Sequence, residues 1–368
     1  MSDIYKNLDT LIFQDKHDNL NIYNGHKDLI KKYLLDDQSY KNAKELLGFV
    51  SKVHKKNYVF NLMEELKLYE SKLERILPKH REHYKHSVNV YILGLAIYNN
   101  CELIRNAVKT PRHLDINNDL QRKSFLFRWS LAAGLHDLAY PLEMSIKTFN
   151  EYLSYLNKYQ ETDRREITIK KSILDYFNII PILDENNLPY SIPKETAIGL
   201  ISNFILTVEN ANLKKEVGFE ELNSYLNKEI QSGFVAGKID HGIFSSLIML
   251  RRIYELYERN NDWDVHDFYY EVVDSATAIF LHNFHKYSNI NNLLGYQKFN
   301  YDGPSSLGYL LTLCDEMCEW DRDNQNDSEK YCIDISDEII RFSVPREKRQ
   351  KLTESINLLN KDIEIYIV

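Results

Sequence analysis

The chain has 368 residues, of which 43% are hydrophobic and 27% are charged, and its formal net charge is −8. This acidic balance speaks against tight, non-specific binding to a nucleic-acid backbone, which requires a basic surface, although a local basic groove stays open. The longest apolar run, near Tyr91–Tyr98, is far too short for a membrane span, so we expect no membrane association.

Gly and Pro are scarce in the chain, so few positions force turns, and long elements are expected, helices more than strands. Residues 1–75 predict an N-terminal extension of several small helices, and a break at Arg75–Pro78 follows it. Residues 106–120 are polar and predict a loop. Pro141 is expected to stop the helix predicted over Ser124–Tyr140. The helices predicted in residues 1–140 are Ala43–Val53, Val59–Leu73, His80 to about Asn99, and Ser124–Tyr140.

Residues 76–325 are predicted to form the core, and residues 145–235 a helical insertion within it, punctuated by Pro181, Pro189 and Pro193. The helical pieces expected in the insertion are Lys147–Lys158, Ile167–Phe177, Lys194–Thr207 and Glu220–Ser232. Core helices are expected to resume at about His241–Arg259, Tyr269–His285 and Ser305–Asp321.

The last segment, residues 326–368, alternates apolar and polar residues and predicts a small cap of strands and one helix. The expected strands are Tyr331–Ile335, Ile339–Val344 and Ile363–Val368, and the expected helix is Arg346–Leu359. The predicted fold class is therefore mainly α, with a helical insertion and a small C-terminal β-containing extension.

The four cysteines form neither a CxxC pair nor the framework of a secreted protein. Cys314 and Cys318 lie four residues apart in a predicted helix and are interpreted as core thiols in a reducing compartment. The first residues lack the basic and apolar segments of a signal peptide. We therefore expect a cytoplasmic protein.

The pair His136–Asp137 lies in an apolar segment, Trp129–Ala139, that is otherwise polar only at Ser130. A helix there must bury most of its circumference. A buried carboxylate beside a buried imidazole costs on the order of several kcal/mol unless it is paired or bound to a metal. Two other His-Asp dipeptides, at residues 17–18 and 266–267, lie in polar surroundings typical of a surface. The pair at 136–137 is therefore predicted to bind a metal ion.

Further polar side chains share a helix face with apolar residues in separate predicted helices. These are His86, His241, His282 and Asp315. One buried histidine is usually a satisfied core residue, but several such cases on different helices predict a common site. Mixed imidazole and carboxylate ligands suit Mn, Fe, Zn, Ni or Co rather than a soft thiolate site.

The order of these residues resembles the HD superfamily of metal-dependent phosphohydrolases. The minimal H…HD…D pattern of that family maps onto His86, His136–Asp137 and Asp315, and the resemblance covers about residues 78–323 apart from the insertion. His241 and His282 resemble the extra ligands of its two-metal branch, which includes HD-GYP-type cyclic-dinucleotide phosphodiesterases. The resemblance implies an HD-domain helical bundle that binds two divalent ions, whose identity among Mn, Fe, Zn, Ni, Co and Mg the sequence does not resolve.

The same resemblance implies a role for each residue. Asp137 would bridge the two ions, while His86, His136 and Asp315 would hold the first and His241 and His282 the second. Phosphoester hydrolysis also needs a general acid or a phosphate clamp. His83 and His285 are the catalytic candidates, because each lies one turn from a proposed ligand, and Lys238 and Arg322 are the candidates for substrate binding.

The implied activity is that of a phosphoric ester hydrolase that cleaves a nucleotide or another small phosphoester through a metal-activated water. Two alternatives stay open: an HD-type nuclease on single-stranded nucleic acid, and a non-catalytic sensor that binds a metal or a nucleotide. Many relatives continue the His-Asp pair with Gly-Lys, where this chain has Ala139-Tyr140-Pro141, and no Gly-Tyr-Pro triplet follows His282. The sequence therefore leaves the substrate open, as it does the oligomeric state.

Overall fold

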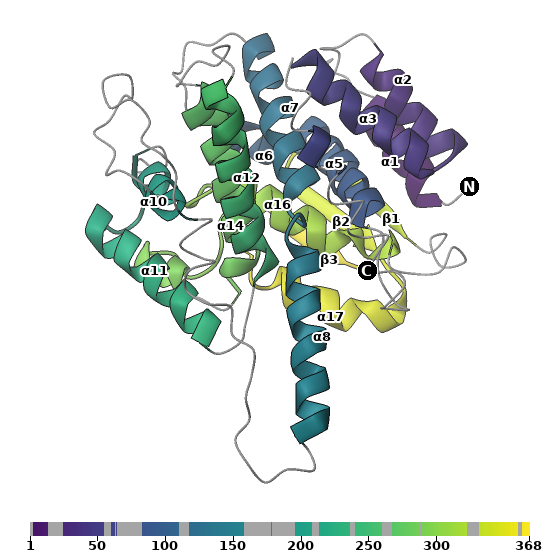
Figure 1. Cartoon of the computed structure of the whole chain (residues 1–368). Coiled ribbons are helices and arrows are strands. Elements are labelled where there is room, and N and C mark those ends of the chain that lie inside the picture. The colour runs from purple at the N-terminus through teal and green to yellow at the C-terminus, as the bar shows by residue number, and fades with distance from the viewer. Residues whose placement is uncertain are drawn as a thin grey trace.

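The structure is a computed structural model that describes residues 3–13, 25–54, 60–62, 64, 83–109, 118–157, 178, 196–207, 213–235, 240–259, 267–286, 289–321, 331–359 and 363–368. Within these residues the fold is mainly α-helical, with a small three-stranded sheet near the C-terminus (Figure 1). The predicted fold class is thereby confirmed at this level. None of the described helices is both long and apolar enough to cross a lipid bilayer.

The helices fall into an N-terminal group, a central group and a set that covers the central group. The N-terminal group is α1 (Asp3–Phe13), α2 (His26–Lys31), which continues into a π-helical turn (Lys32–Asp36), and α3 (Tyr40–Val53). The central group is α5 (His83–Asn100), α7 (Asn118–Leu135), α12 (His241–Arg259), α14 (Asp274–Phe284) and α16 (Ser306–Met317). The remaining helices are α6 (Glu102–Ala107), α8 (Tyr140–Asn157), α10 (Ala197–Thr207), α11 (Phe219–Val235), α15 (Ile290–Leu293) and α17 (Arg346–Ile356).

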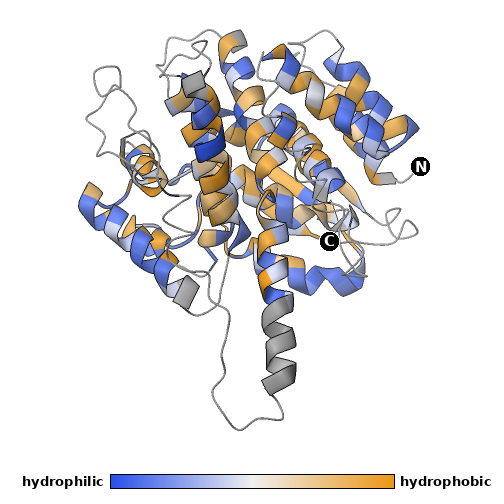
Figure 2. Ribbon diagram, viewed as in Figure 1, coloured by the Kyte–Doolittle hydropathy of each residue, from blue (hydrophilic) through white to orange (hydrophobic). Residues whose placement is uncertain are grey.

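The core lies where the central helices pack on one another. Helix α14 contacts α7, α12 and α16, and α5 contacts α7 and α16. The hydrophobic residues coloured orange in Figure 2 gather along these helices. Helix α10, which lies in the predicted insertion, also packs on α12 and α14, and its residues 197–205 are buried. The predicted helices Val59–Leu73 and Ile167–Phe177 lie almost wholly outside the described residues.

Helix α5 is buried on every side, since each residue from His86 to Asn99 is buried. Its close approach to α7 depends on Gly94, where a Cβ atom would lie 2.1 Å from Cζ2 of Trp129. The Trp129 indole donates a 2.9 Å hydrogen bond to the Tyr91 carbonyl on the same part of α5. A residue without a side chain therefore lets the largest aromatic ring of α7 lie directly against the α5 backbone.

The end of α7 differs from the prediction. A single helix over Ser124–Tyr140 was expected, but α7 ends at Leu135, residues 136–139 form a turn, and α8 begins at Tyr140. The prediction that Pro141 stops a helix is wrong, because Pro141 lies in the first turn of α8. Proline is tolerated there since the first backbone N–H groups of a helix have no partner within it. The pair His136–Asp137 consequently lies in a turn between two helices.

A buried ion pair fixes α7 relative to α14. Arg128 and Asp274, both buried, form a charge-assisted hydrogen bond, and Arg128 Nη2 also donates to the Val108 carbonyl at 2.6 Å. Asp274 begins α14 directly after a π-helical segment, Phe268–Val273, so the predicted helix from Tyr269 changes its winding at this residue. A pair buried in this way strongly resists the loss of either partner.

The C-terminal cap is the sheet β1 (Cys332–Ile335), β2 (Ile339–Ser343) and β3 (Glu364–Ile367). β1 pairs antiparallel with β2, and β2 pairs parallel with β3 after the chain passes through α17. These elements agree with the predicted strands and helix, because alternating burial along β1 and β2 produces the period-2 pattern. Helix α1 contacts β1, where the Asn7 carboxamide accepts a 2.7 Å hydrogen bond from the Ile333 amide.

Candidate metal centre

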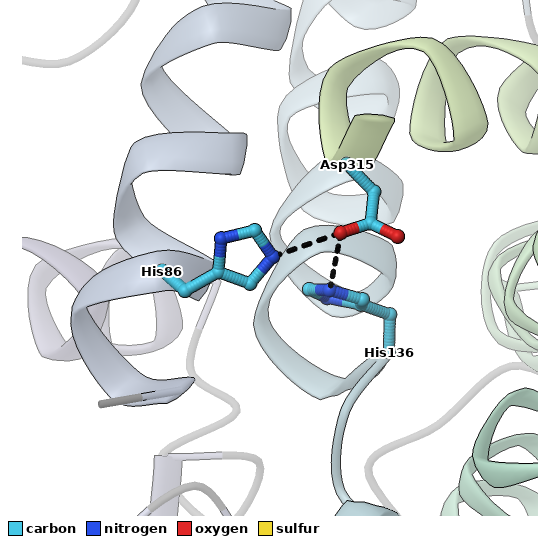
Figure 3. A group of neighbouring side chains, drawn as sticks. All are labelled: His86, His136 and Asp315. Atoms are coloured by element: carbon cyan, nitrogen blue, oxygen red, sulfur yellow. Dashed lines mark hydrogen bonds and ion pairs between the residues drawn. The ribbon is translucent and has the colours of Figure 1, made fainter. Parts of the chain in front are cut away.

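Three segments bring imidazole and carboxylate groups together between α5, α7 and α16 (Figure 3). His86 lies near the start of α5, His136 in the turn after α7, and Asp315 near the end of α16. Asp315 Oδ1 is 2.9 Å from His86 Nε2 and 3.9 Å from His136 Nε2. One ligand atom from each of the three residues lies within 4.8 Å of the other two. Ligand atoms around one ion are about 3–4 Å apart, so a small contraction would let all three bind a single ion.

Asp137 connects this group to a further imidazole through its two oxygen atoms. Its Oδ2 atom is 3.3 Å from His136 Nε2 and 3.9 Å from His86 Nε2. Its Oδ1 atom is 3.3 Å from Nε2 of His241, at the start of α12. The carboxylate therefore faces different imidazoles with its two oxygens, which is the arrangement that a ligand shared by two ions requires.

His282 on α14 completes the cluster. Its ring centroid lies 5.6 Å from that of His136 and 5.4 Å from that of His241, and its side chain is fully buried. The structure thus brings together the whole set of residues that the sequence predicted as metal ligands. That set is His86, His136, Asp137, His241, His282 and Asp315.

Two of these imidazoles have their proton position fixed by the backbone. His136 Nδ1 is 2.9 Å from the Ala133 carbonyl, and His282 Nδ1 is 2.6 Å from the Ile279 carbonyl. A carbonyl only accepts hydrogen bonds, so Nδ1 of each ring carries a proton, and Nε2 is the atom through which the neutral ring would bind a metal ion. Within the described part of the chain neither buried Nε2 atom has a hydrogen-bond partner. His136 Nε2 faces the Asp137 carboxylate at 3.3 Å, so a cation between them could contact both groups.

The environment keeps the His282 imidazole neutral. Its burial, together with the nearby imidazoles of His241 and His136, lowers the pKa of His282 to about 3. A neutral imidazole is the form that binds metal ions. At physiological pH the buried Nε2 atom of His282 is therefore a free acceptor that faces the other ligands.

His241 is oriented by a residue that was not predicted. The Glu143 carboxylate on α8 lies 2.7 Å from His241 Nδ1 and accepts a 3.0 Å hydrogen bond from the His241 backbone amide. Burial lowers the pKa of His241, but the hydrogen bond with Glu143 and the charges of Asp137 and Asp240 outweigh it and raise the pKa to about 9. A proton therefore competes with a cation for His241 Nε2, which Asn283 Nδ2 approaches at 2.9 Å.

Helix α12 approaches α14 closely because residue 242 is a glycine. A Cβ atom at Gly242 would lie 2.7 Å from Cε1 and 2.9 Å from Nδ1 of His282. The Asp240 side chain accepts a 3.0 Å hydrogen bond from the Ile243 amide and so caps the start of α12. The glycine therefore allows His241 and His282, on two different helices, to share one site.

Of the other predicted site residues, His285 alone has a described side chain, and it packs on Phe299 instead. His285 is buried with its ring stacked on Phe299 at 4.8 Å, and its Nδ1 atom lies 3.2 Å from the Leu281 carbonyl. Burial lowers the pKa of His285 to about 4. His83 begins α5, but its side chain lies outside the description, as do Lys238 and Arg322.

Glu143 and Asn283 are the residues of the site that the sequence did not reveal. Glu143 was hidden by the prediction that the helix stops at Pro141, and recognising Pro141 as a first-turn residue would have placed Glu143 in the first turn of α8. Asn283 directly follows a predicted ligand, but neighbouring residues of a helix point about 100° apart, so no spacing rule links it to His241.

The donor set fits a divalent transition ion. It consists of imidazole nitrogens and carboxylate oxygens, and the thiols of Cys314 and Cys318 are not part of it. The anchored Nδ1–H groups of His136 and His282 are the kind of outer-shell contact that orients metal-binding histidines. The unpaired Nε2 atoms would find in a bound cation the partner that they lack.

No family model, curated protein or solved structure matches this chain.

Proposed function

We propose that this protein is a metal-dependent phosphoric ester hydrolase that acts on a nucleotide or another small phosphoester. The observation that supports the proposal most is the pair of buried Nε2 atoms of His136 and His282, which face the ligand cluster without a hydrogen-bond partner among the described residues. An unpaired buried acceptor costs about 1–3 kcal/mol. A site that keeps two of them beside the Asp137 carboxylate is explained by a cation between them.

In this proposal His86, His136 and Asp315 would hold one ion, His241 and His282 would hold a second, and Asp137 would be a ligand of both. When bound, the ions make a water molecule more acidic and polarise the phosphoryl group. The chain supplies the orientation: the carbonyls of Ala133 and Ile279 keep the protons of their histidines on Nδ1. Glu143 holds the Nδ1 atom of His241, so that its Nε2 atom faces Asp137.

The ligand set is tested by the metal content of the purified full chain after expression with added Mn or Fe. We expect two equivalents per chain, and a loss of metal in Asp137→Ala. The matched control is Asp267→Ala, which removes the carboxylate of another His-Asp dipeptide, before the π-helical segment. A chain that binds no metal under these conditions would overturn the proposal.

The activity is tested with a panel of nucleotides, small phosphoesters and single-stranded nucleic acid in the presence of Mn. We expect turnover of a small phosphoester and a loss of at least about a hundredfold in Asp137→Ala, because even outer-shell changes cost about 10–100-fold. Asp267→Ala should keep the wild-type rate. Turnover that survives Asp137→Ala would refute the role given to that residue, and turnover of single strands alone would replace the proposed substrate class by nucleic acid.

A further inference from the structure

The proposed centre has a lysine beside it. Lys286 lies two residues after the end of α14, and its ammonium group donates a 2.8 Å hydrogen bond to Asn283 Oδ1. The other end of the same carboxamide, Asn283 Nδ2, lies 2.9 Å from His241 Nε2. A single carboxamide thus separates the lysine charge from one of the proposed metal ligands.

These contacts limit how far the ammonium group can be from the centre. With the dimensions of a carboxamide, Lys286 Nζ lies at most about 8 Å from His241 Nε2. Metal–ligand distances of about 2.1 Å place the outer oxygens of an ion-bound phosphoryl group about 5–6 Å from that nitrogen. An ammonium group inside this limit can form a charge-assisted hydrogen bond, about 2.8 Å long, with an outer oxygen that lies on its side of His241.

The hydrogen bonds also determine which groups become available when an ion binds. In the neutral form of His241, which is the form that binds a metal ion, Nε2 can accept a hydrogen bond from Asn283 Nδ2, 2.9 Å away. An ion at that nitrogen takes the lone pair, so the amide N–H groups need another acceptor. An oxyanion on the ion lies within reach of both the Asn283 amide and the Lys286 ammonium group.

A cation beside the site would favour the binding of an anionic substrate. Asp137, Asp315 and Glu143 all place carboxylates in or beside the cluster. Ions bound there would neutralise these carboxylates, but an anionic substrate brings additional negative charge. A fixed positive side chain at the edge of the site lowers the energy of that charge.

We propose that Lys286, with the Asn283 carboxamide, forms an oxyanion subsite that binds a phosphoryl group of the substrate at the second ion. This inference rests on the proposed function. The Lys286 side chain is 30% exposed, so an incoming ligand can reach it. In the ion-free chain Glu316, 15% exposed on α16, forms an ion pair with Lys286 and therefore competes with the oxyanion for the ammonium group.

Because Glu316 and the oxyanion compete for the Lys286 ammonium group, substitutions can distinguish a role of Lys286 in oxyanion binding from a purely structural role. An ion pair near the surface typically contributes little to stability, so neither Lys286 nor Glu316 is required for the fold. Removal of the lysine charge should weaken oxyanion binding, whereas removal of the glutamate charge should strengthen it. A merely structural ion pair would respond to both substitutions in the same direction.

The test is calorimetric titration of inorganic phosphate into the Mn-loaded full chain, with metal content measured for every variant. We expect Lys286→Met to weaken phosphate binding at least about tenfold while it keeps two Mn per chain, since hydrogen bonds to charged groups are the strong ones. Lys286→Arg should restore binding, and Glu316→Gln should tighten it. The matched control is Lys123→Met, an exposed lysine on α7 located 13 residues before His136 and thus about 20 Å away along the helix.

The possible results distinguish a failure of the oxyanion subsite from a failure of the metal centre. Two bound Mn ions with equal phosphate affinity in wild type and Lys286→Met would overturn the oxyanion subsite and leave the metal centre standing. Weaker binding in Glu316→Gln would overturn the competition on which the inference depends. A wild-type chain that binds no Mn would overturn the proposed function itself, and the subsite with it.

Discussion

The Gly242→Ala substitution tests whether the two helices that carry His241 and His282 are positioned for a shared ion. The added methyl group would lie 2.7 Å from His282 Cε1, about 0.7 Å closer than the 3.4 Å at which ordinary van der Waals contact begins. The His282 ring cannot move freely, because its Nδ1 atom is hydrogen-bonded to the Ile279 carbonyl. The backbone carbonyl of His282 also accepts a hydrogen bond from the Thr312 hydroxyl. The substitution therefore forces either the ring or the start of α12 to shift.

A shift of this size matters more for metal binding than for folding. Overpacking in a core typically costs about 1–3 kcal/mol, which a protein of this size tolerates. Metal–ligand distances, however, must agree within about 0.2 Å. We therefore expect Gly242→Ala to lower the free energy of unfolding by about 1–3 kcal/mol and to lower bound Mn from two ions per chain to one.

The assay combines metal analysis with urea denaturation. The matched control is Gly218→Ala, because a Cβ atom at Gly218 meets nothing within 4 Å. Gly218 precedes α11, so its substitution can change stability by about 1 kcal/mol but should leave the metal content unchanged. Wild-type metal content and stability in Gly242→Ala would refute the reasoning.

Three further substitutions test the packing that positions the site, each by urea denaturation. Gly94→Ala should destabilise the fold severely, because its Cβ atom would lie 2.1 Å from the Trp129 ring, and wild-type stability would contradict the close approach of α5 and α7. Asp274→Ala should cost about 3–5 kcal/mol, since it leaves the buried charge of Arg128 unpaired, whereas the double substitution of both residues by leucine and methionine should cost less. His26 is buried, and burial lowers its pKa from 6.5 to about 4. As the pH falls, the unfolded chain therefore takes up a proton at His26 before the folded chain does. The contribution of neutral His26 to the free energy of unfolding is complete above pH 6.5 and is lost as the pH falls to about 4. The total loss is about 3 kcal/mol. His26→Gln should flatten this part of the pH dependence, and an unchanged slope would show that His26 does not cause it.

The local pattern of the sequence predicted much of the secondary structure. The alternation in the last 40 residues predicted three strands because one face of β1 and β2 is buried and the other exposed. The apolar surroundings of His136 predicted its burial for a similar reason. The predicted helix Ala43–Val53 agrees with α3 within its first turn.

The pattern was ambiguous where a segment is buried on all sides. Helix α5 has no exposed face between His86 and Asn99, so hydrophobic periodicity cannot define the direction in which His86 points. The break at Pro141 was ambiguous in another way, because proline is compatible both with the end of one helix and with the first turn of the next. In the structure Pro141 lies in the first turn of α8. Helix α8 packs on α12, and this packing brings Glu143 to His241.

The sequence by itself predicted the burial of His86, His136 and His282, because burial depends on the hydrophobicity of the neighbours along the chain. It did not predict the burial of Arg128, Asp274 or His26. It also did not determine which atoms of the buried residues meet. His86 and Asp315 are separated by 229 positions along the chain, and their contact arises from the packing of α5 on α16. The contacts of Glu143 and Asn283 with the site also depend on helix packing. The sequence did not predict them, because a charged or polar residue at the edge of a buried cluster has no hydrophobic pattern of its own. Only the packing of the helices decides where such a residue lies.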